Sequence, residues 1–431
     1  MKNSIKYFGL VLLVLLSFQS QAQEKGTRDL DNFRSPDQRG INQFEAPKDT
    51  TSTSNEVQVR IGGASTIQFQ ALNHETTGTP VNADGDPLSL IEIGNNFNLP
   101  TANLDLDVSL YDGVRMHLRT YLSSRHHTEP YVKGGYIQID KLDFISEGFM
   151  EPLMKNLRIK IGHMENNYGD AHFRRSDNAQ AIYNPFVGNL IMDSFTTEVG
   201  AELYYFKNGL IVMGGLTNGK LNQGVNKPDT TDPSIIAKLG YDKQITEDLR
   251  VRLTGSLYKT NKSANAYLYH ADRAGSRYYL VMESEEASSS RNFTSGRFSP
   301  DFRNELTSFM VNPFVKYGGL EFFGTYERAT GKSSNETDTR SYNQYAGELI
   351  YRFGNNENVY LGGRYNLVDG EMADGSNIDI SRFNLAAGWF MTKNILAKLE
   401  YVSQEYNGFA ANNLYNGGKF NGMMIEAVIS F

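Results

Sequence analysis

The stretch NLDLDVSLYDGVRMHLRTYL (residues 103–122) decides the fold of this chain. Apolar and polar residues alternate with a period of two on both sides of Tyr111-Asp112-Gly113, which is typical of strands with one apolar and one polar face. A two-residue turn would put the two apolar sets on opposite faces. The pattern therefore predicts a three-residue turn with Gly113 in the left-handed conformation. The predicted cross-strand pairs are Asp105 with Arg119 and Asp107 with His117.

The same unit recurs from residue 57 to the C-terminus. Further strong alternation covers residues 249–257, 309–326, 345–367, 383–401 and 423–431, and weaker strands fit 57–72, 131–140, 157–162, 198–205, 210–216 and 235–241. Together these give about sixteen strands, an even number within the range of bacterial barrels. We expect an all-β fold, a transmembrane antiparallel β-barrel. A secreted β-sandwich or solenoid is the alternative that would also alternate.

Short turns alternate with long polar stretches along this series of strands. Outer-membrane barrels have short periplasmic turns and long external loops. The external loops are expected near residues 73–101, 123–130, 163–196, 218–233, 259–304, 330–341, 368–378 and 404–418. One periplasmic turn, 141–156, is unusually long and is expected to carry a helical turn. Loop 259–304 is expected to be simply exposed at the surface.

The first residues indicate the compartment. Lys2 and Lys6 precede the apolar run 8–18, and Ser20-Gln21-Ala22 offers a small-x-small cleavage site, the signature of a secretory signal peptide. We expect a signal peptide at 1–22, a flexible periplasmic arm at 23–56, because that segment is polar and rich in turn residues, and the barrel at 57–431. The arm could instead enter the barrel or bind a partner. The chain has no Cys, which excludes disulfides and a lipoprotein anchor.

Composition excludes some classes of protein. After Ala22 no apolar run reaches the length of a membrane-spanning helix, and the mean hydropathy is -0.46. A barrel stays compatible, because only alternate strand residues meet lipid. The 40 Gly and 25 Tyr suit tight turns and interfacial aromatic rows. The net charge of -7 argues against nucleic acid as a partner.

The polar strand faces are expected to line the lumen, and a barrel of this size holds a water-filled channel unless it is plugged. The loop from 163 to 196 is the candidate plug, with its apolar patch 183–187 as an anchor on the inner wall. Here the sequence resembles the general porin pattern, in which the loop after the fifth strand folds inward and forms the constriction. The last strand ends on Phe431, as in outer-membrane barrels, where that strand is read by the assembly machinery.

A narrower resemblance covers about residues 157–241. The segments 157–162, 168–169, 199–205 and 215–219 resemble the phosphate-selective porin family (O/P-like). The resemblance implies inward cations that conduct anions. The matching cations would be Arg115, Arg119, Arg158 and Lys160 on strands and Arg174 and Arg175 in the loop; further inward cations are Arg60, Lys238, Arg250, Arg252, Arg364, Arg382 and Lys398.

Inward acids are also plentiful: Glu198, Glu202, Glu321, Glu327, Glu348, Glu400 and Glu426. No lysine cluster of the family's kind is visible, so we expect a mixed-charge constriction with a modest anion bias. The predicted pore-lining residues are Arg115, Arg119, Arg158, Lys160, His172, Arg174, Arg175, Arg250, Arg252, Glu198 and Glu202. For any one of these residues, simple solvation of the inner wall is the competing interpretation.

Metal binding and catalysis find little support. His126-His127, and His163 with Glu165 and His172, have ligand chemistry, but nothing in the sequence fixes their geometry. The chain has no G-x-S-x-G, H-E-x-x-H or Walker A motif. We expect no catalytic residues, no metal and no cofactor.

The predicted function is passive diffusion of small polar solutes or ions, with anions favoured. The alternative is a non-conducting barrel that serves as scaffold or subunit of an outer-membrane assembly, and a barrel enzyme is the third hypothesis. Expected partners are outer-membrane lipid, small polar or anionic solutes and the barrel-assembly machinery through Phe431. The porin resemblance also implies a homotrimer.

Overall fold

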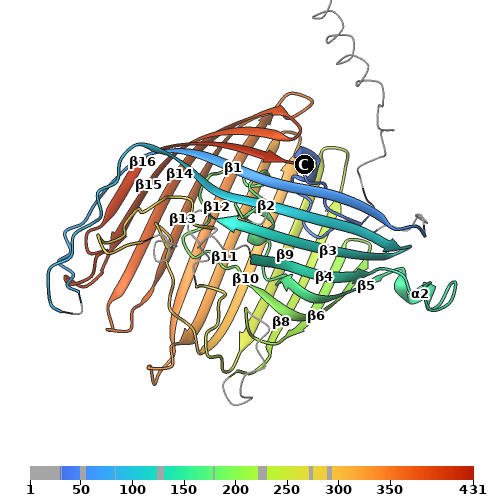
Figure 1. The fold of residues 1–431 in the computed structure, drawn as a ribbon, viewed down its shortest axis with the longest axis horizontal. Coiled ribbons are helices and arrows are strands. Elements are labelled where there is room, and N and C mark those ends of the chain that lie inside the picture. The colour runs from blue at the N-terminus through green and yellow to red at the C-terminus, as the bar shows by residue number, and fades with distance from the viewer. Residues whose placement is uncertain are drawn as a thin grey trace, which may run out of the picture.

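A computed structural model describes residues 30, 32–48, 55–82, 84–123, 131–177, 180–221, 231–270, 275–288 and 294–431. In these residues sixteen strands close into one antiparallel barrel, in which every strand pairs with its sequence neighbours and β1 pairs with β16 (Figure 1). The expected fold class is confirmed. The predicted signal peptide, 1–22, lies outside the described residues.

The strands follow the predicted series closely. They are β1 (Gln58–Glu75), β2 (Asn96–Tyr111), β3 (Val114–Ser123), β4 (Tyr131–Ile139), β5 (Leu157–Glu165), β6 (Thr197–Lys207), β7 (Leu210–Thr217), β8 (Ser234–Gln244), β9 (Leu249–Thr260), β10 (Glu305–Tyr317), β11 (Leu320–Lys332), β12 (Arg340–Phe353), β13 (Val359–Glu371), β14 (Asn377–Thr392), β15 (Ile395–Asn407) and β16 (Lys419–Ser430). The short and long connections alternate as expected. In the long turn between β4 and β5, a single helical turn, α2 (Glu151–Met154), confirms the prediction for that turn.

The first hairpin has the predicted register. Gly113 has φ +73°, and a register shift between Ser109 and Tyr111 absorbs the extra turn residue. Asp105 therefore pairs with Arg119, as predicted, and faces the interior, whereas Leu104 beside it is 54% exposed on the outer face. This alternation puts the polar residues of the hairpin inside the barrel and its leucines outside.

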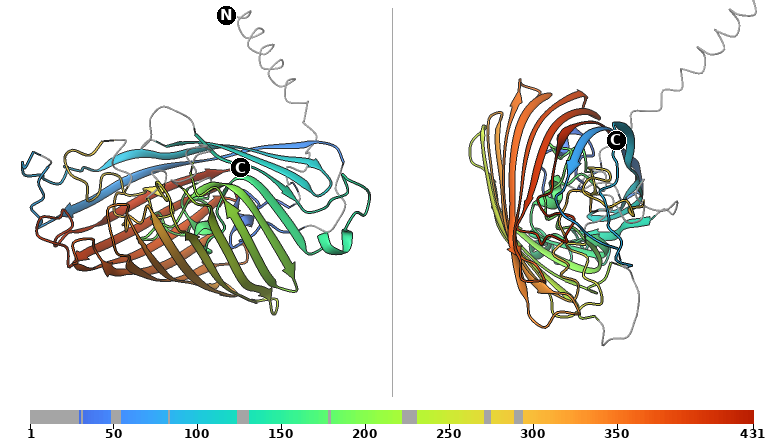
Figure 2. Two further views of the ribbon diagram at one scale, coloured as in Figure 1. Left: turned by 90° about the horizontal axis from the view of Figure 1, so that it is seen from below. Right: turned by 90° about the vertical axis from the view of Figure 1, so that its left-hand side faces the viewer.

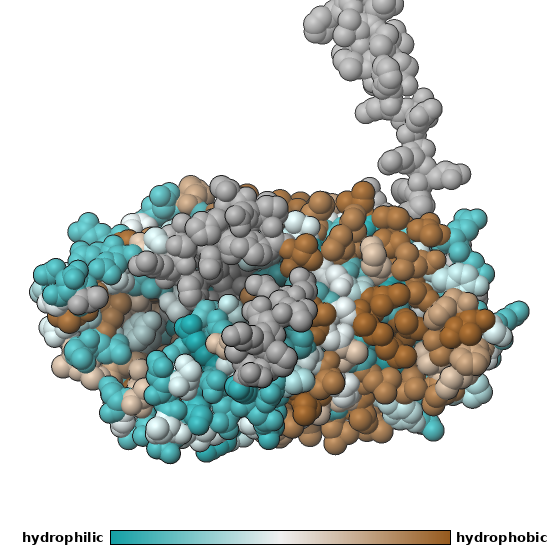
Figure 3. Space-filling model, turned by 60° about the horizontal axis from the view of Figure 1, so that its bottom comes forward, coloured by the Kyte–Doolittle hydropathy of each residue, from teal (hydrophilic) through white to brown (hydrophobic). Residues whose placement is uncertain are grey.

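The outer surface carries an apolar band. Figure 3 shows apolar residues gathered over the half of the molecule that carries α2 and hydrophilic residues over the opposite half, where the long loops lie. On β12 the outward residues run from Tyr345 through Leu349 to Tyr351 and Phe353, all between 44% and 55% exposed. Aromatic rows above and below an aliphatic row are typical of strands that cross a bilayer.

Three chain segments occupy the interior of the barrel. They are the lumen segment (residues 32–48), the inner loop (166–196, without 178–179) and the long loop (261–304, without 271–274 and 289–293). Figure 2, in its right-hand view, shows chain inside the ring of strands. The view of residues 32–48 as part of a free periplasmic arm is therefore corrected, since Phe44 is 2% exposed among wall residues. Residues 23–29, 31 and 49–54 of that arm lie outside the described residues.

The long loop also differs from its prediction as a surface loop. Leu268, Tyr269, Tyr278, Val281 and Met282 are at most 3% exposed and belong to an apolar cluster with the inner loop and the inward faces of the wall. The sequence does not predict this packing, because the apolar residues of the long loop are scattered among charged ones. Among the described residues, no helix has the length and apolar character needed to cross a membrane.

The apolar band predicts a depth-dependent cost for charge on the outer face. Leu349→Arg places a cation midway between the aromatic rows, and we expect it to lower the free energy of unfolding in phospholipid bilayers by about 2–4 kcal/mol. Unfolding in denaturant, followed by the heat-modifiable shift on electrophoresis, measures this change.

The matched control is Ser341→Arg on the outer face of the same strand, beyond Tyr345 toward the long loops. It should cost about 0–1 kcal/mol, as charges near the interface do. Equal costs for the two variants would mean that the band does not face lipid.

Candidate functional site in the barrel lumen

Charged side chains from neighbouring strands pair across the inner wall. Arg119 donates from Nε and Nη2 to the two carboxylate oxygens of Asp105 at 2.7 and 2.8 Å. Nδ1 of His117 lies 2.6 Å from Oδ1 of Asp107, which also pairs with Arg60. The second predicted pair, Asp107 with His117, is thus confirmed. Charges removed from bulk water need such partners, because an unpaired buried charge costs several kcal/mol.

The far wall has the same chemistry with larger acids. Further pairs join Arg352 to Glu321 at 3.1 Å, Arg364 to Glu348 at 2.7 Å and Lys398 to Glu426 at 3.0 Å. All six side chains are at most 3% exposed. Each pair links adjacent strands between β11 and β16, so the cation and the acid of each pair neutralise one another.

The inner loop adds its own charges to the wall. The two arginines at its start are both paired: Arg174 with Glu321 at 2.7 Å and Glu348 at 3.1 Å, and Arg175 with Asp193 at 2.7 Å and Asp177 at 2.6 Å. Neither arginine therefore presents a lone charge to the lumen.

Apolar residues and backbone groups fix the other end of the inner loop. Phe186 and Val187 are fully buried, and the Val187 N–H donates to Glu400 at 2.8 Å. The Ile191 N–H donates to Asn366 at 2.7 Å. The predicted anchoring of patch 183–187 on the inner wall is confirmed, since it packs with residues of β12, β13, β14, β15 and β16.

A four-charge cluster joins the lumen segment, the inner loop and the wall. Arg252 donates to Asp170 of the inner loop at 2.8 Å and to Glu45 of the lumen segment at 2.8 Å. Lys238 lies 3.0 Å from Asp170 and 3.4 Å from Glu45. Burial opposes ionisation of both acids, but the field of Arg252 and Lys238 outweighs it. The pKa of Glu45 falls to about 2, and the pKa of Asp170 is held well below its usual range.

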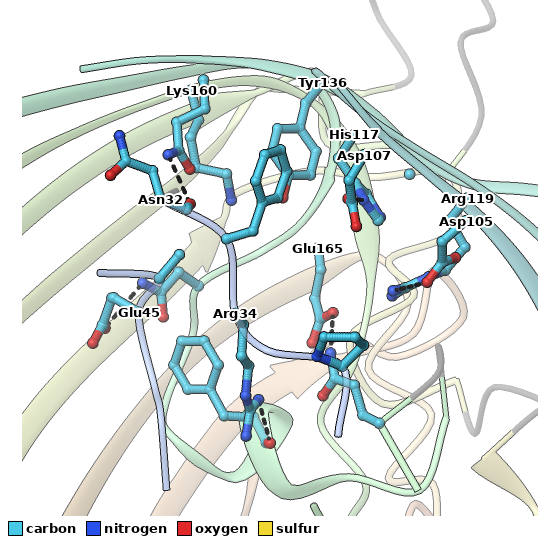
Figure 4. A pocket seen from close by; sticks show the side chains of 18 of the residues that line it. Asn32, Arg34, Glu45, Asp105, Asp107, His117, Arg119, Tyr136, Lys160 and Glu165 are labelled. Atoms are coloured by element: carbon cyan, nitrogen blue, oxygen red, sulfur yellow. Dashed lines mark hydrogen bonds and ion pairs between the residues drawn. The ribbon is translucent and has the colours of Figure 1, made fainter. Parts of the chain in front are cut away.

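A cavity of about 190 Å³ lies between the lumen segment, the inner loop and the inner faces of β1 to β6. Figure 4 shows Asp105, Asp107, His117, Arg119, Tyr136 and Lys160 of the wall facing Arg34 and Glu45 of the lumen segment. Its charged lining consists of six cations, Arg34, Arg60, Arg119, Lys133, Arg158 and Lys160, and four acids, Glu45, Asp105, Asp107 and Glu165, with His117 and His172 beside them.

Arg34 differs from the other cations of this lining. Its guanidinium donates at 2.9 Å to two backbone carbonyls, those of Gly40 and Phe173, and stacks 3.6 Å from the centre of the Tyr183 ring. Burial lowers the pKa of Arg34 to about 10, and the guanidinium stays charged near neutral pH. Lys160 is held less tightly than most wall cations, 3.5 Å from Glu202.

The cavity gathers only part of the predicted pore-lining set. Arg119, Arg158, Lys160 and His172 line it. The other predicted residues are held elsewhere: Arg115 at the β2–β3 turn by Ser109 and the carbonyl of Tyr111, Arg250 by Asp242, Glu198 by Thr217 and Tyr258, Glu202 by Tyr204 and the N–H of Asn167, and Arg174, Arg175 and Arg252 in the pairs given above.

Some lining residues were not predicted. Arg34 and Glu45 come from the lumen segment, where no strand periodicity marks which residues face inward. Lys133 was missed because a register shift between Arg119 and Thr120 changes the pairing of β3 with β4. It pairs with Asp177 at 2.6 Å. The inward position of Lys133 depends on this register shift, and the alternation of the sequence does not reveal the shift.

The described histidines considered as metal ligands are held by hydrogen bonds to neighbouring side chains, and His172 also contacts Asn167 through Nε2 at 3.1 Å. His172 Nδ1 lies 2.7 Å from Glu165, and His163 Nε2 lies 3.0 Å from the Thr197 hydroxyl. No group of three His, Asp or Glu side chains suited to a metal occurs in the described ranges. His126 and His127 lie outside them.

The barrel resembles those of solved outer-membrane porins. An anion-selective porin from Comamonas acidovorans is 12% identical with a TM-score of 0.52, over 87% of this chain and 100% of that one. OmpT, an outer membrane protein of Vibrio cholerae, is 12% identical with a TM-score of 0.51, over 88% and 99%. Salmonella typhi OmpF, solved with daunomycin, is 11% identical with a TM-score of 0.51, over 88% and 100%. The TM-scores show that the chain shares its barrel fold with these porins at low sequence identity.

No protein-family model matches the chain, and no curated protein sequence matches it.

The four-charge cluster predicts a loss of stability in acid. Because the pKa values of Glu45 and Asp170 are lower in the folded chain, both acids stabilise it above their unfolded pKa values of about 4. That stabilisation is lost as the pH falls from about 4 through 2. Asp170→Asn should remove much of this pH dependence and cost on the order of 3 kcal/mol at pH 7, since it breaks a buried ion pair. Denaturant unfolding at pH 7, 4 and 2.5 measures both effects.

Asp338→Asn, in the exposed connection between β11 and β12, is the matched control. It should leave the stability at pH 7 within about 0.5 kcal/mol of the wild type and keep the acid dependence. An unchanged acid dependence in Asp170→Asn would show that the cluster does not govern it.

Proposed function

We propose that this protein is an outer-membrane channel through which small polar solutes and ions diffuse passively. The observation that carries the proposal is the charged cavity inside a closed barrel, bounded by the lumen segment, the inner loop and the wall from β1 to β6. Its lining offers charge and hydrogen-bonding groups on all sides, which replace part of the hydration of a passing solute. Selection by size and charge needs no chemical step, so we propose no enzymatic activity and no cofactor.

The charge of this path favours anions modestly. Six cations face four acids in the lining, but most of these cations are paired with carboxylates of the wall or the inner loop. Arg34 bonds to carbonyls, and Lys160 lies 3.5 Å from its carboxylate, so these two contribute most to the field. One such charge in a wet lumen changes the energy of an ion by on the order of 1 kcal/mol. The resemblance to phosphate-selective porins supports anions as a class.

The inner loop forms the constriction in this proposal. It crosses the lumen from β5 to the wall of β12–β15, and the cavity lies on the side it leaves open. His172, at its start, borders the cavity. In this proposal the predicted pore-lining residues that lie away from the cavity, among them Arg115, Arg250 and Glu198, stabilise the wall.

Export and assembly follow from the sequence in this proposal. The predicted signal peptide delivers the chain to the periplasm, and the barrel-assembly machinery reads the last strand, which ends on Phe431. The outward apolar band contacts outer-membrane lipid. A homotrimer is proposed because OmpT of Vibrio cholerae has been solved in a trimer form.

A second candidate is a non-conducting barrel that serves as scaffold or subunit of an outer-membrane assembly. The apolar cluster between the long loop, the inner loop and the wall favours it, because fully buried Val281, Met282, Leu306 and Met310 fill much of the lumen as a protein core would. Both candidates agree with the fold, and electrical conductance separates them.

Purified refolded protein in a planar bilayer should give steady ohmic conductance steps. Under a salt gradient, the wild-type reversal potential should have the sign of anion preference. Lys160→Gln should lower the anion-to-cation permeability ratio several-fold, since this loosely paired charge contributes on the order of 1 kcal/mol. The salt-gradient reversal potential measures the ratio.

The matched control is Arg303→Gln, which removes a half-exposed cation of the long loop that pairs with Asp301 away from the cavity. It should leave the reversal potential unchanged. A folded, heat-modifiable wild-type barrel that never conducts would refute the channel and favour the scaffold.

A further inference from the structure

We infer that the lumen segment is a removable plug, which narrows the mouth of the barrel on the side of the short turns and leaves as a unit while the strand pairing of the barrel stays intact. The inference rests on the proposed conduction through this lumen and adds a second, wider state to it. Its evidence is the path of residues 32–48, the kind of contacts they make and the partners that the wall keeps without them.

The segment lies as a strap across the barrel mouth. Lys48 pairs with Asp140 at the end of β4 at 3.0 Å, and Asn42 donates to Glu321 of β11 at 2.7 Å. Further along, the hydroxyl of Ser430, at the end of β16, donates to the carbonyl of Pro36 at 2.5 Å. These wall residues lie near the short-turn ends of strands on different sides of the barrel. The strap therefore covers the same end of the lumen from wall to wall.

The segment adds nothing to the β-ladders. Within the described residues, its regular structure is the single turn η2 (Gln38–Gly40), and it joins no strand pairing. A backbone bond to the wall runs from the Gln38 N–H to the carbonyl of Lys393 at 2.8 Å. The segment precedes β1, which begins at Gln58 at the short-turn end of the wall. Withdrawal therefore breaks no strand pair.

The wall keeps its buried charges paired when the segment leaves. Arg252 retains Asp170 at 2.8 Å and Asp242 at 3.0 Å. Glu321 retains Arg352 and Arg174, Lys238 retains Asp170, and Asp140 retains Arg158. If withdrawal of the segment left a buried ion without a partner, it would cost several kcal/mol of free energy. Here each buried wall charge that the segment contacts has another partner, and Lys393, which pairs with Asp37, is 56% exposed, so removal leaves no lone buried ion.

One aromatic side chain holds the segment most firmly. Phe44 is 2% exposed and packs edge-on against Phe314 at 5.3 Å and Phe173 at 5.8 Å between ring centres. Its burial is the main apolar contact of the segment with the wall. Weakening this contact should raise the fraction of molecules with the plug withdrawn.

Phe44→Ala should raise the frequency of large-conductance openings on the order of tenfold or more relative to the wild type, since truncating a buried Phe weakens its site strongly. The matched control is Phe298→Ala, a buried aromatic of the long loop that packs on Tyr342 and Phe409 and not on the segment. It should leave the openings at the wild-type frequency.

A reversible disulfide that holds the segment against the wall tests the same withdrawal by preventing it. The chain has no Cys, so the double variant Gln38→Cys, Lys393→Cys holds the only two thiols, at neighbouring backbone positions. Oxidation should abolish the large openings, and reduction should restore them. Each single variant, treated with the same oxidant, should behave as the wild type.

Trypsin cleavage of the folded barrel after Arg34, Arg39 or Lys48 gives a readout that needs no conductance, since cleavage follows the population of the withdrawn state. Phe44→Ala should be cut faster than the wild type, and the oxidised double variant should resist cleavage. Equal cleavage and equal openings in Phe44→Ala and Phe298→Ala would overturn the plug. Faster cleavage in Phe44→Ala without conductance in any variant would uphold the plug and refute the proposed channel.

Discussion

The pairing of charges inside the barrel is the constraint on which the rest of this structure depends. Strand alternation turns every second residue inward, and in this chain those residues are rich in Arg, Lys, Asp and Glu. A closed barrel withdraws them from bulk water, so each needs a partner nearby. Cross-strand pairs such as Asp105 with Arg119 meet that need within the wall, and Arg252, with three acids around it, meets it with help from inserted chain.

The inserted segments divide the lumen into two unlike halves. Toward β8–β16, the long loop and the inner loop bring Tyr278, Met282 and Val187 against the wall, and that half is packed as a protein core. Toward β1–β6, the wall charges pair mostly with one another, and space is left between them. The proposed route for solutes is therefore confined to the side that the loops leave open.

The same residues tie the lumen segment and the inner loop together. Asp170 of the inner loop and Glu45 of the lumen segment share Arg252 and Lys238, and Arg34 donates to the carbonyl of Phe173. A displacement of either segment therefore alters the contacts of the other, because both bind Arg252 and Lys238. The boundary of the cavity is set by two chain segments far apart in sequence, so its size depends on their relative positions as well as on the wall.

The sequence by itself determined the barrel, its strands and the alternation of short and long connections. It also determined the pairing of Asp105 with Arg119 and of Asp107 with His117, because period-two alternation and turn chemistry are local properties of the chain. It also identified the inward charges and the anchor at 183–187. Only the tertiary structure decided which of those charges border one cavity, that residues 32–48 enter the lumen and that the long loop is buried. These depend on contacts such as Phe44 with Phe314, between residues whose separation in sequence carries no periodic signal.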